Sequence, residues 1–385
     1  MTNITYFDNA ATTFPKPEEV YRFMDSFYRE CGVNVGRGQH RLASKGAYIV
    51  AETRKLLTDL THCPNKQVIF TPTATEALNL IIRSYVCRNN INVYVSPFEH
   101  NAVTRVINYA RQSYDFNVIT LAFDIKSSSY DLDQISCQFE LNKPDVLIVS
   151  HASNVCGVIA PISEICIKAK EYGSVNIIDM CQTMGLIDTD LSSECIDFAV
   201  FAGHKTLYGP QGLGGLLMSP GATLKPLIYG GTGVDSANPL LPDEIPERYE
   251  VGSQNILAIA GLNASLKWIL GTGVSTLFDK EQRSHRELIN LFSQYNNIRL
   301  VSPRDISLGI GVVSVVFDGY SSDNIAQILS DHNIAVRSGL HCAPVAHQVL
   351  GTFPAGTVRF SIGYFTDESD FTKLKKVLDY ISENS

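Results

Sequence analysis

The sequence has no Cys-x-x-Cys pair, and its nine cysteines are scattered singly along 385 residues. An odd number of isolated cysteines argues against a disulfide framework and a tetrathiolate zinc site, and is typical of the reducing cytoplasm. No apolar run approaches the ~20 residues that span a bilayer, and Met1–Thr5 lacks the charged and apolar regions of a signal peptide. With a net charge of −8 and no basic run, neither a membrane nor a nucleic acid is expected as a partner.

Helical and apolar strand patterns alternate between residues 16 and 254. This alternation predicts an α/β domain with a mostly parallel sheet covered by helices, and the chain length favours a second domain. Strands are expected at Val68–Phe70, Asn92–Val95, Val146–Val149, Ile177–Ile178, Phe198–Phe201, Gly215–Leu217, Val312–Phe317 and Val358–Ser361. Helices are expected at Pro17–Cys31, Lys45–Thr61, Thr75–Tyr85, Ile256–Leu270, Ser275–Gln294 and Asp367–Ser382.

A lysine and an aspartate stand at the ends of two of these strands. Phe201 leads into His204 and Lys205, and the strand at Ile177–Ile178 ends in Asp179. Ligands of parallel α/β sheets bind at the carboxyl ends of the strands, so the two side chains are expected in one site. A Schiff-base lysine and a carboxylate that keeps a ring nitrogen protonated are what pyridoxal phosphate (PLP) requires. The sequence therefore predicts a PLP-dependent enzyme.

The segment Thr71–Ala77 follows a strand and opens a helix. Free backbone N–H groups and the positive end of the helix dipole would bind a phosphate there, with Thr75 adding a hydroxyl. The alternative is an ordinary N-cap with Thr and Glu in the first turn. The presence of Asp179 and Lys205 favours the phosphate site.

Three more polar residues follow or interrupt strands. His100 can stack over a cofactor ring and move protons, although a structural histidine is the alternative. Asn154 can donate its amide to cofactor or substrate, or belong to a polar turn. Arg359 interrupts an apolar strand, and its planar fork fits either a substrate carboxylate or a structural ion pair.

Cys342 differs from the other cysteines because it lies in a polar loop bounded by glycine and proline, close to Arg337 and His341. Positive charge nearby raises the thiolate fraction of a cysteine, so this residue is a candidate nucleophile or redox-active thiol. The other eight cysteines are expected to be small core hydrophobes, and that remains the alternative for Cys342.

Together these residues resemble the class V aminotransferase superfamily of PLP fold type I, and most closely the cysteine desulfurases of the Suf-type, group II branch. The resemblance covers essentially the whole chain. It implies a large domain of residues 16–254 with a seven-stranded, mostly parallel sheet, and a small α+β domain of residues 1–15 and 255–385. The motifs that carry it, in family order, are Asp8–Thr13, Asn34–His40, Thr75–Ala77, Glu99-His100, Ser153–Gly157, Asp179–Gln182, Gly203–Pro210, Arg337–Ala343 and the segment around Arg359.

The resemblance implies a role for each matching residue. Lys205 would hold the cofactor and shuttle the α-proton, His100 would stack on the ring, and Cys342 would be the nucleophile. Cofactor contacts are implied for Ala74, Thr75, Asn154, Asp179, Gln182, His204 and, from the partner in a homodimer whose site lies at the subunit interface, Ser253. Substrate contacts are implied for Asn9, His40, Asn154 and Arg359, and no metal ligand is implied.

The implied activity is cysteine desulfuration, in which L-cysteine becomes L-alanine and a persulfide on Cys342 passes to an acceptor protein. Selenocysteine lyase and a catalytically silent desulfurase-like scaffold stay as alternatives. The acceptor stays open among iron–sulfur cluster assembly, molybdenum-cofactor sulfuration, tRNA thiolation and selenium metabolism. One position departs from the family pattern: Ala202 stands where a Ser or Thr usually bonds the phosphate, a hydrogen bond worth ~1 kcal/mol.

Overall fold

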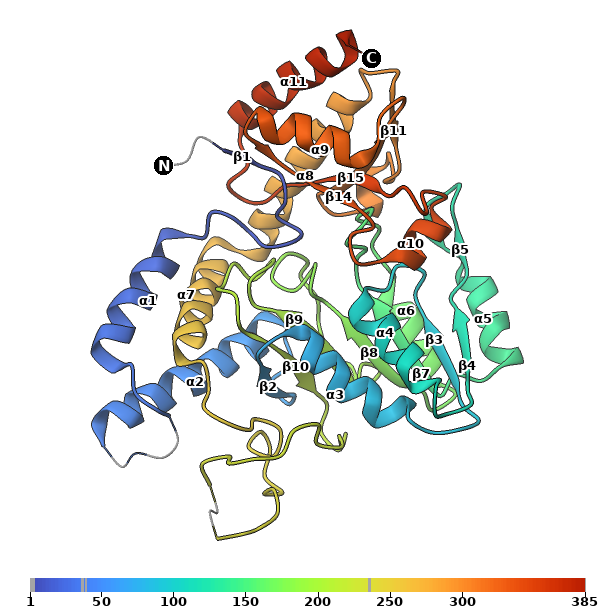
Figure 1. The fold of residues 1–385 in the computed structure, drawn as a ribbon. Helices are drawn as coiled ribbons and strands as arrows, with labels where there is room; N and C mark the ends of the chain where they lie inside the picture. Colours follow the sequence, from blue (N-terminus) through green and yellow to red (C-terminus); the bar gives the residue numbers. More distant parts are fainter. Residues whose placement is uncertain (1–3, 36–37, 39, 235–236, 385) are drawn as a thin grey trace.

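The computed structural model describes residues 4–35, 38, 40–234 and 237–384, and a seven-stranded sheet forms its centre (Figure 1). Five neighbouring strands run parallel, and among the described strands of this sheet β10 alone is antiparallel to its two neighbours. The prediction of a mostly parallel α/β sheet is confirmed. In sheet order the strands are β2 (Gln67–Thr71), β10 (Gly214–Met218), β9 (Phe198–Ala202), β8 (Val175–Asp179), β7 (Val146–Ser150), β3 (Asn92–Val95) and β4 (Asn117–Thr120).

Helices cover both faces of this sheet, and each face has its own buried core. Successive residues of β2 point to opposite faces, so Val68 and Phe70 enter one core and Ile69 enters the other. Strands buried on both faces read as continuous apolar runs. The core containing Ile69 packs against α3 (Ala74–Val86) and α4 (Asn101–Ala110), and the other core lies under α2 (Arg41–Leu60), α5 (Leu132–Leu141), α6 (Ile162–Lys170) and α7 (Ile256–Thr272).

A smaller antiparallel sheet is formed by the C-terminal part of the chain, at the top of Figure 1. The N-terminal strand β1 joins this region by pairing with β13, and Phe7 lies in the core beneath the sheet. The sheet order is β11 (Ile298–Leu300), β12 (Val312–Phe317), β15 (Thr357–Ser361) and β14 (Arg337–Gly339). Around it lie β1 (Thr5–Tyr6), β13 (Ile334–Ala335), α8 (Val274–Phe292), α9 (Ser322–Asp331) and α11 (Glu368–Glu383).

The helix α7 packs against α1 (Glu18–Cys31) and α2, beside the large sheet. It ends at Gly273, whose φ of 90° suits a residue without a side chain, and α8 continues at an angle of 82°. No helix in the described part of the chain is by itself long and apolar enough to cross a membrane, although α7 and α8 reach that length together across their bend. The division of the chain at residues 254 and 255 stays a prediction.

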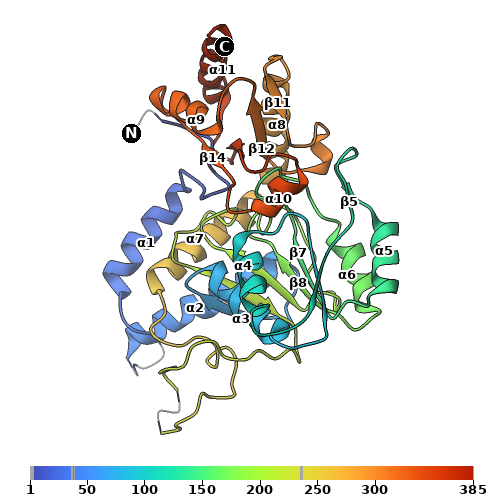
Figure 2. The ribbon, with the colours of Figure 1, turned by 45° about the vertical axis from the view of Figure 1, so that its right-hand side comes forward.

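The remaining elements lie around the junction of the two sheets. Both views place α10 (Pro344–Val349) between the large and the small sheet (Figures 1 and 2), and Cys342 precedes this helix by two residues. Strands β5 (Phe123–Asp124) and β6 (Ser129–Tyr130) form a hairpin, and Ile306–Leu308 forms a short 3-10 helix.

Candidate active site

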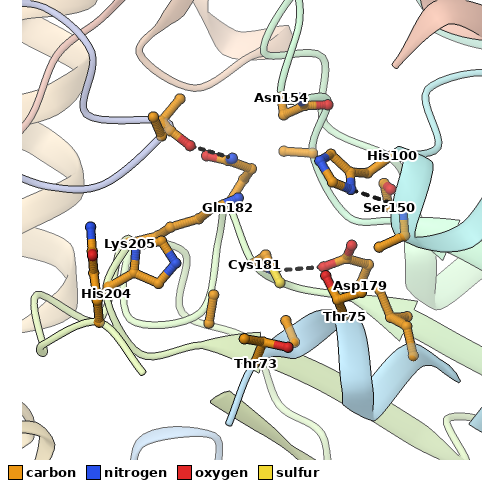
Figure 3. Close-up of a pocket in the computed structure, with 18 of the residues that line it drawn as sticks. Thr73, Thr75, His100, Ser150, Asn154, Asp179, Cys181, Gln182, His204 and Lys205 are labelled. Atoms are coloured by element: carbon orange, nitrogen blue, oxygen red, sulfur yellow. Dashed lines mark hydrogen bonds between the residues drawn. The ribbon is translucent and has the colours of Figure 1, made fainter. Parts of the chain in front are cut away.

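A cavity of about 440 Å³ lies at the carboxyl ends of the parallel strands. Ser150, Asp179 and Ala202 line it from the ends of β7, β8 and β9, as expected for a ligand site of a parallel sheet. Figure 3 shows how the labelled side chains surround this space. The structure brings together here the predicted residues Ala74, Thr75, His100, Asn154, Asp179, Gln182, His204, Lys205 and Arg359.

Lys205 has a fixed backbone and a free ammonium group. The preceding carbonyl, that of His204, accepts hydrogen bonds from the Thr12 hydroxyl (3.1 Å), the Thr13 amide (3.1 Å) and the Lys16 ammonium (2.9 Å). The Nζ of Lys205 makes no hydrogen bond or ion pair with any residue that the structure describes. An amine that faces a cavity without a partner can form a Schiff base with an aldehyde.

Asp179 and Gln182 present polar atoms to the same space. Asp179 is buried, and its Oδ1 accepts a hydrogen bond of 2.9 Å from the Cys181 amide. The Nε2 of Gln182 donates to the carbonyl of Ala10 at 3.0 Å, which fixes the side chain (Figure 3). A buried carboxylate held in this way can pair with a protonated ring nitrogen.

The start of α3 leaves backbone donors free at the cavity. The Thr73 hydroxyl caps the helix by accepting from the Glu76 amide at 3.2 Å. Within the described residues, the amides of Ala74 and Thr75 donate no hydrogen bond, and the buried Nδ1 of His204 has no partner. Unsatisfied donors at a helix N-terminus bind phosphate, so this end of the cavity fits the phosphate of PLP.

Gly214 brings that helix close to the sheet. A Cβ at this position would lie 2.5 Å from the Ala74 nitrogen, so the approach of α3 to β10 requires a glycine. Ala202 pairs with Gly214 across β9 and β10. Its methyl group therefore lies beside the free amides, at the place from which a hydroxyl could reach a phosphate.

His100 is held as a neutral ring. Its Nδ1 accepts a hydrogen bond of 3.0 Å from the Ala102 amide at the start of α4, so the proton of the neutral imidazole is on Nε2. Burial, and then the charge of Lys205, lower the pKa of His100 to about 4. The ring lines the cavity uncharged, which suits stacking against an aromatic cofactor.

Glu99, just before His100, is a buried residue that the sequence reasoning did not assign. Its carboxylate accepts hydrogen bonds from the Ser96 hydroxyl (2.6 Å) and from the Ser150 amide (2.7 Å) and hydroxyl (2.9 Å). Burial raises the pKa of Glu99 to about 7, although these hydrogen bonds oppose the shift. Glu99 thus ties the end of β3 to the end of β7.

Arg359 forms the structural ion pair that was one of its two alternatives, and it also lines the cavity. The guanidinium is buried at the cavity wall, and it pairs with the Asp8 carboxylate at 2.6 Å and donates to the Asn154 carbonyl at 3.0 Å. Its Nε has no partner among the described residues. Burial lowers the pKa of Arg359 and the Asp8 charge opposes this shift. The ion pair leaves donors that can receive a carboxylate.

Cys342 lies beside the cavity and is joined to it through Arg337. Arg337 lines the cavity, and its Nη2 contacts the Cys342 sulfur at 3.1 Å. The Cys342 carbonyl accepts from the Asn101 amide at 2.7 Å, which fixes the loop against the start of α4. Of the other eight cysteines, Cys137 is exposed, so the prediction of a core position is wrong for it.

Besides Cys342, three predicted residues do not line this cavity. Ser253 lies in a neighbouring hollow together with Pro72 and Gly212, which border both spaces. His40 is exposed and caps α2 through a hydrogen bond from the Ala43 amide, at 3.2 Å. Asn9 is buried, with its amide bound to the Ser361 carbonyl and its oxygen to the Phe14 amide. Gly36, Arg37 and Gln39 of the predicted motif lie outside the described residues.

The sequence reasoning also missed lining residues. Cys181 is the buried core residue that was expected, and it also lines the cavity; burial raises its pKa well above the usual value. Its position between Asp179 and Gln182, two predicted site residues, could have indicated that it lines the cavity. Gln211 lines the cavity from the turn after Lys205, where a Gly-Pro-Gln-Gly sequence follows the lysine. In the described part of the chain no cluster of three or more His, Cys, Asp or Glu side chains forms a metal site.

Comparison with known proteins gives consistent matches along the chain. The family model "Aminotransferase class-V" matches residues 5–374. A probable cysteine desulfurase of Pyrococcus abyssi is 30% identical, over 98% of this chain and 94% of that protein. Another from Haemophilus influenzae is 30% identical, over 98% of this chain and 86% of the relative.

Solved structures match as well. The apo structure of the cysteine desulfurase from Thermococcus onnurineus NA1 has a TM-score of 0.90 at 27% identity, covering 99% of this chain and 95% of that one. The cysteine desulfurase CsdA from Escherichia coli has a TM-score of 0.84 at 25% identity, with the same coverage of both chains.

Proposed function

The chain belongs to the aminotransferase class-V family, and we propose that it is a PLP-dependent cysteine desulfurase. The enzyme releases L-alanine from L-cysteine and leaves the sulfur on Cys342. The observation that carries this proposal is the contact of the Cys342 thiol with Arg337, a residue of the cavity that also holds Asp179 and Lys205. A sulfur acceptor beside a PLP-type cavity is what desulfuration needs and other PLP reactions do not.

The residues present fit PLP, which when bound supplies an electron sink that stabilises negative charge at the substrate α-carbon. Asp179 would pair with the ring nitrogen, and Gln182 would reach the ring oxygen. The amides at the start of α3, the Thr75 hydroxyl and His204 would hold the phosphate. His100 would stack on the ring, and Lys205 would hold the cofactor.

The substrate is held and activated by the chain's own groups. Arg359, kept in place by Asp8, receives the substrate carboxylate, and Asn154 lies beside it. The neutral amine of Lys205 would take the α-proton, because it lines the cavity without a hydrogen-bond partner among the described residues. The Cys342 thiolate attacks the substrate sulfur, so that an S–S bond forms as the Cβ–S bond breaks. The electron pair of the broken bond stays with the substrate, which takes up a proton and leaves as alanine.

We assign Ser253 to a site that the isolated chain does not complete, whereas the substrate contacts of His40 and Asn9 stay predictions. Ser253 adjoins the phosphate end of the cavity through Pro72 and Gly212, which supports a contribution across the interface of a homodimer. An acceptor protein in the cytoplasm then takes the sulfur from Cys342. The cysteines of the chain are free thiols, which suits a reducing compartment.

The test is alanine release from L-cysteine in the presence of a reductant, with the native protein, Cys342→Ser and Cys137→Ser. The exposed Cys137 is the matched control. Cys342→Ser should lose activity by at least ~10²-fold, the low end of what one catalytic group contributes, while Cys137→Ser keeps it. In a parallel reaction without the reductant, a mass increase of one sulfur atom on the Cys342 peptide should follow turnover. Equal alanine release by the native protein and Cys342→Ser would exclude Cys342 as the sulfur carrier.

A further inference from the structure

The loop that carries Cys342 has an uncommon backbone conformation. His341 and Cys342 have φ values of 49° and 59°, in the left-handed region that side chains disfavour. The base of the loop is equally constrained, since a Cβ at Gly356 would lie 2.4 Å from the carbonyl of Gly339. Two successive non-glycine residues hold this conformation only where their surroundings fix it.

A chain of buried hydrogen bonds fixes it from the side of His341. The Ser314 hydroxyl donates to the Val155 carbonyl at 2.6 Å, because a carbonyl can only accept. The Thr357 hydroxyl must then donate to Ser314, at 3.0 Å, and its oxygen accepts from the Nε2 of His341, at 2.9 Å. Each of these three hydrogen bonds therefore has a single possible donor, and the proton of the neutral His341 ring is on Nε2.

This support is independent of pH. The Nδ1 of His341 is buried without a partner among the described residues. Burial, and then the charge of Arg359, lower the pKa of His341 to about 2, so the ring stays neutral in any ordinary buffer. The hydrogen bond from His341 to Thr357 is therefore kept over the pH range of ordinary buffers.

These hydrogen bonds also connect the loop that carries Cys342 to the cavity wall. Ser314 is in β12 and Thr357 in β15, whereas Val155 follows β7, so the bonds connect the small sheet to the large one. Asn154, next to Val155, donates to the His341 carbonyl at 2.8 Å. The turn at Asn154 and Val155, which follows β7, thus holds both the side chain and the backbone of His341.

We propose that His341 is a positioning residue that keeps Cys342 against Arg337. His341 is itself held by the series of hydrogen bonds that runs through Thr357 and Ser314 to the Val155 carbonyl. The importance of this position for turnover rests on the proposed function of Cys342 as sulfur carrier. The positioning of Cys342 by His341 does not depend on that function, and it is tested without substrate.

The experiment compares Thr357→Val, which breaks the chain without changing side-chain shape, with Thr352→Val. Thr352 is a matched control, because it is also buried and also bonds a histidine ring, that of His347, at 2.7 Å. Thr357→Ser keeps both hydrogen bonds and should restore the native behaviour. Ser314→Ala removes the next link and replaces Thr357→Val if that variant does not fold.

Amide hydrogen exchange is measured on the holoenzyme for the peptide that contains Cys342, where the Ala343 amide bonds to the Leu340 carbonyl at 2.8 Å. Thr357→Val should raise exchange of this peptide at least tenfold, by a local opening, while Thr352→Val and Thr357→Ser leave it within about twofold. In the same variant kcat for alanine release should fall about tenfold, with KM within about twofold, because Cys342 acts after substrate binds.

Exchange at the native rate in Thr357→Val would overturn the inference. An equal rise in exchange in Thr352→Val, spread over the whole chain, would also overturn it, since the effect would then be general destabilisation. If the native protein releases no alanine but exchange responds as expected, the proposed function is wrong and the positioning of Cys342 by His341 is supported.

Discussion

At the scale of the residue, Ala202 lines the cavity beside the proposed phosphate site and offers no side-chain donor. Its methyl group lies at the end of β9, opposite Gly214 and therefore beside the free amides of α3. Donors come from those amides, from Thr75 and from His204, but none comes from position 202. A hydroxyl introduced there would meet the phosphate without altering the backbone.

We expect Ala202→Ser to lower the dissociation constant of PLP about fivefold, the effect of one neutral hydrogen bond of ~1 kcal/mol. The measurement is an absorbance titration of the apoprotein with PLP. Ala152→Ser is the control, because Ala152 also lines the cavity but follows β7, two strands away from β9. An unchanged dissociation constant for Ala202→Ser would show that the existing donors already satisfy the phosphate.

Arg359 shows how far a single residue can be read from sequence. An arginine within an apolar strand predicts a buried cation that needs an anion, and the structure supplies Asp8. The family resemblance implied a place for Arg359 in the site, but the local pattern could not show that one guanidinium does both, because Asp8 and Arg359 meet only after β15 and the N-terminal segment come together. The type of partner was predictable, whereas the choice between ion pair and ligand site depends on tertiary structure.

At the scale of the element, a largely buried ion pair helps to fix the segment that contains Ser253. The Glu250 carboxylate binds the Arg54 guanidinium of α2 in a bidentate pair, with contacts of 2.6 and 2.8 Å. It also accepts from the Phe70 amide at 2.7 Å, and Arg54 stacks 4.6 Å from the Phe70 ring centre. The pair therefore joins the segment to α2 and β2 at once.

Arg54→Met should destabilise the protein by about 3 kcal/mol, because it leaves the Glu250 charge buried and unpaired. Urea unfolding measures the loss, and Arg54→Met combined with Glu250→Leu should recover much of it. The control is Arg29→Met, which removes an exposed ion pair with Asp25 and should cost under about 1 kcal/mol. Equal losses for Arg54→Met and Arg29→Met would contradict a structural role for the buried pair.

The strands illustrate which elements a sequence reveals. Six of the seven strands of the large sheet were predicted, because burial on both faces leaves a continuous apolar run. β4 was missed, since this edge strand is mostly exposed and carries Asn and Thr at its ends. Its pairing with β3 is a tertiary contact that no local sequence pattern predicts.

At the scale of the whole molecule, the sequence predicted a cavity at the strand ends but not what covers it. The order of strand-end residues was sufficient to bring Asp179 and Lys205 together. The approach of the Cys342 loop depends on where the small sheet sits over the large one. That placement is set by contacts between distant segments, such as the bond from Asn154 to the His341 carbonyl.

Glu281 of α8 lies where the two parts of the molecule meet. It is buried, and its carboxylate accepts a hydrogen bond of 2.8 Å from the Gly311 amide that precedes β12. Burial raises the pKa of Glu281 to about 7, although this hydrogen bond opposes the shift. Between the unfolded pKa of 4.5 and this folded value, the folded state binds the proton more tightly than the unfolded state does. The contribution of Glu281 to the free energy of unfolding must therefore fall as pH rises through this window.

Glu281→Gln removes that dependence, because an amide has the same shape, still accepts from Gly311 and carries no charge. At pH 8 the variant should exceed the native protein in free energy of unfolding by up to about 3 kcal/mol, and the difference should shrink towards pH 5. Urea unfolding at both pH values measures it, with Asp279→Asn, an exposed carboxylate on the same helix, as the control. If the difference between the variant and the native protein stays constant with pH, Glu281 is ionised throughout this range in the folded protein. The junction of the two sheets then tolerates its charge.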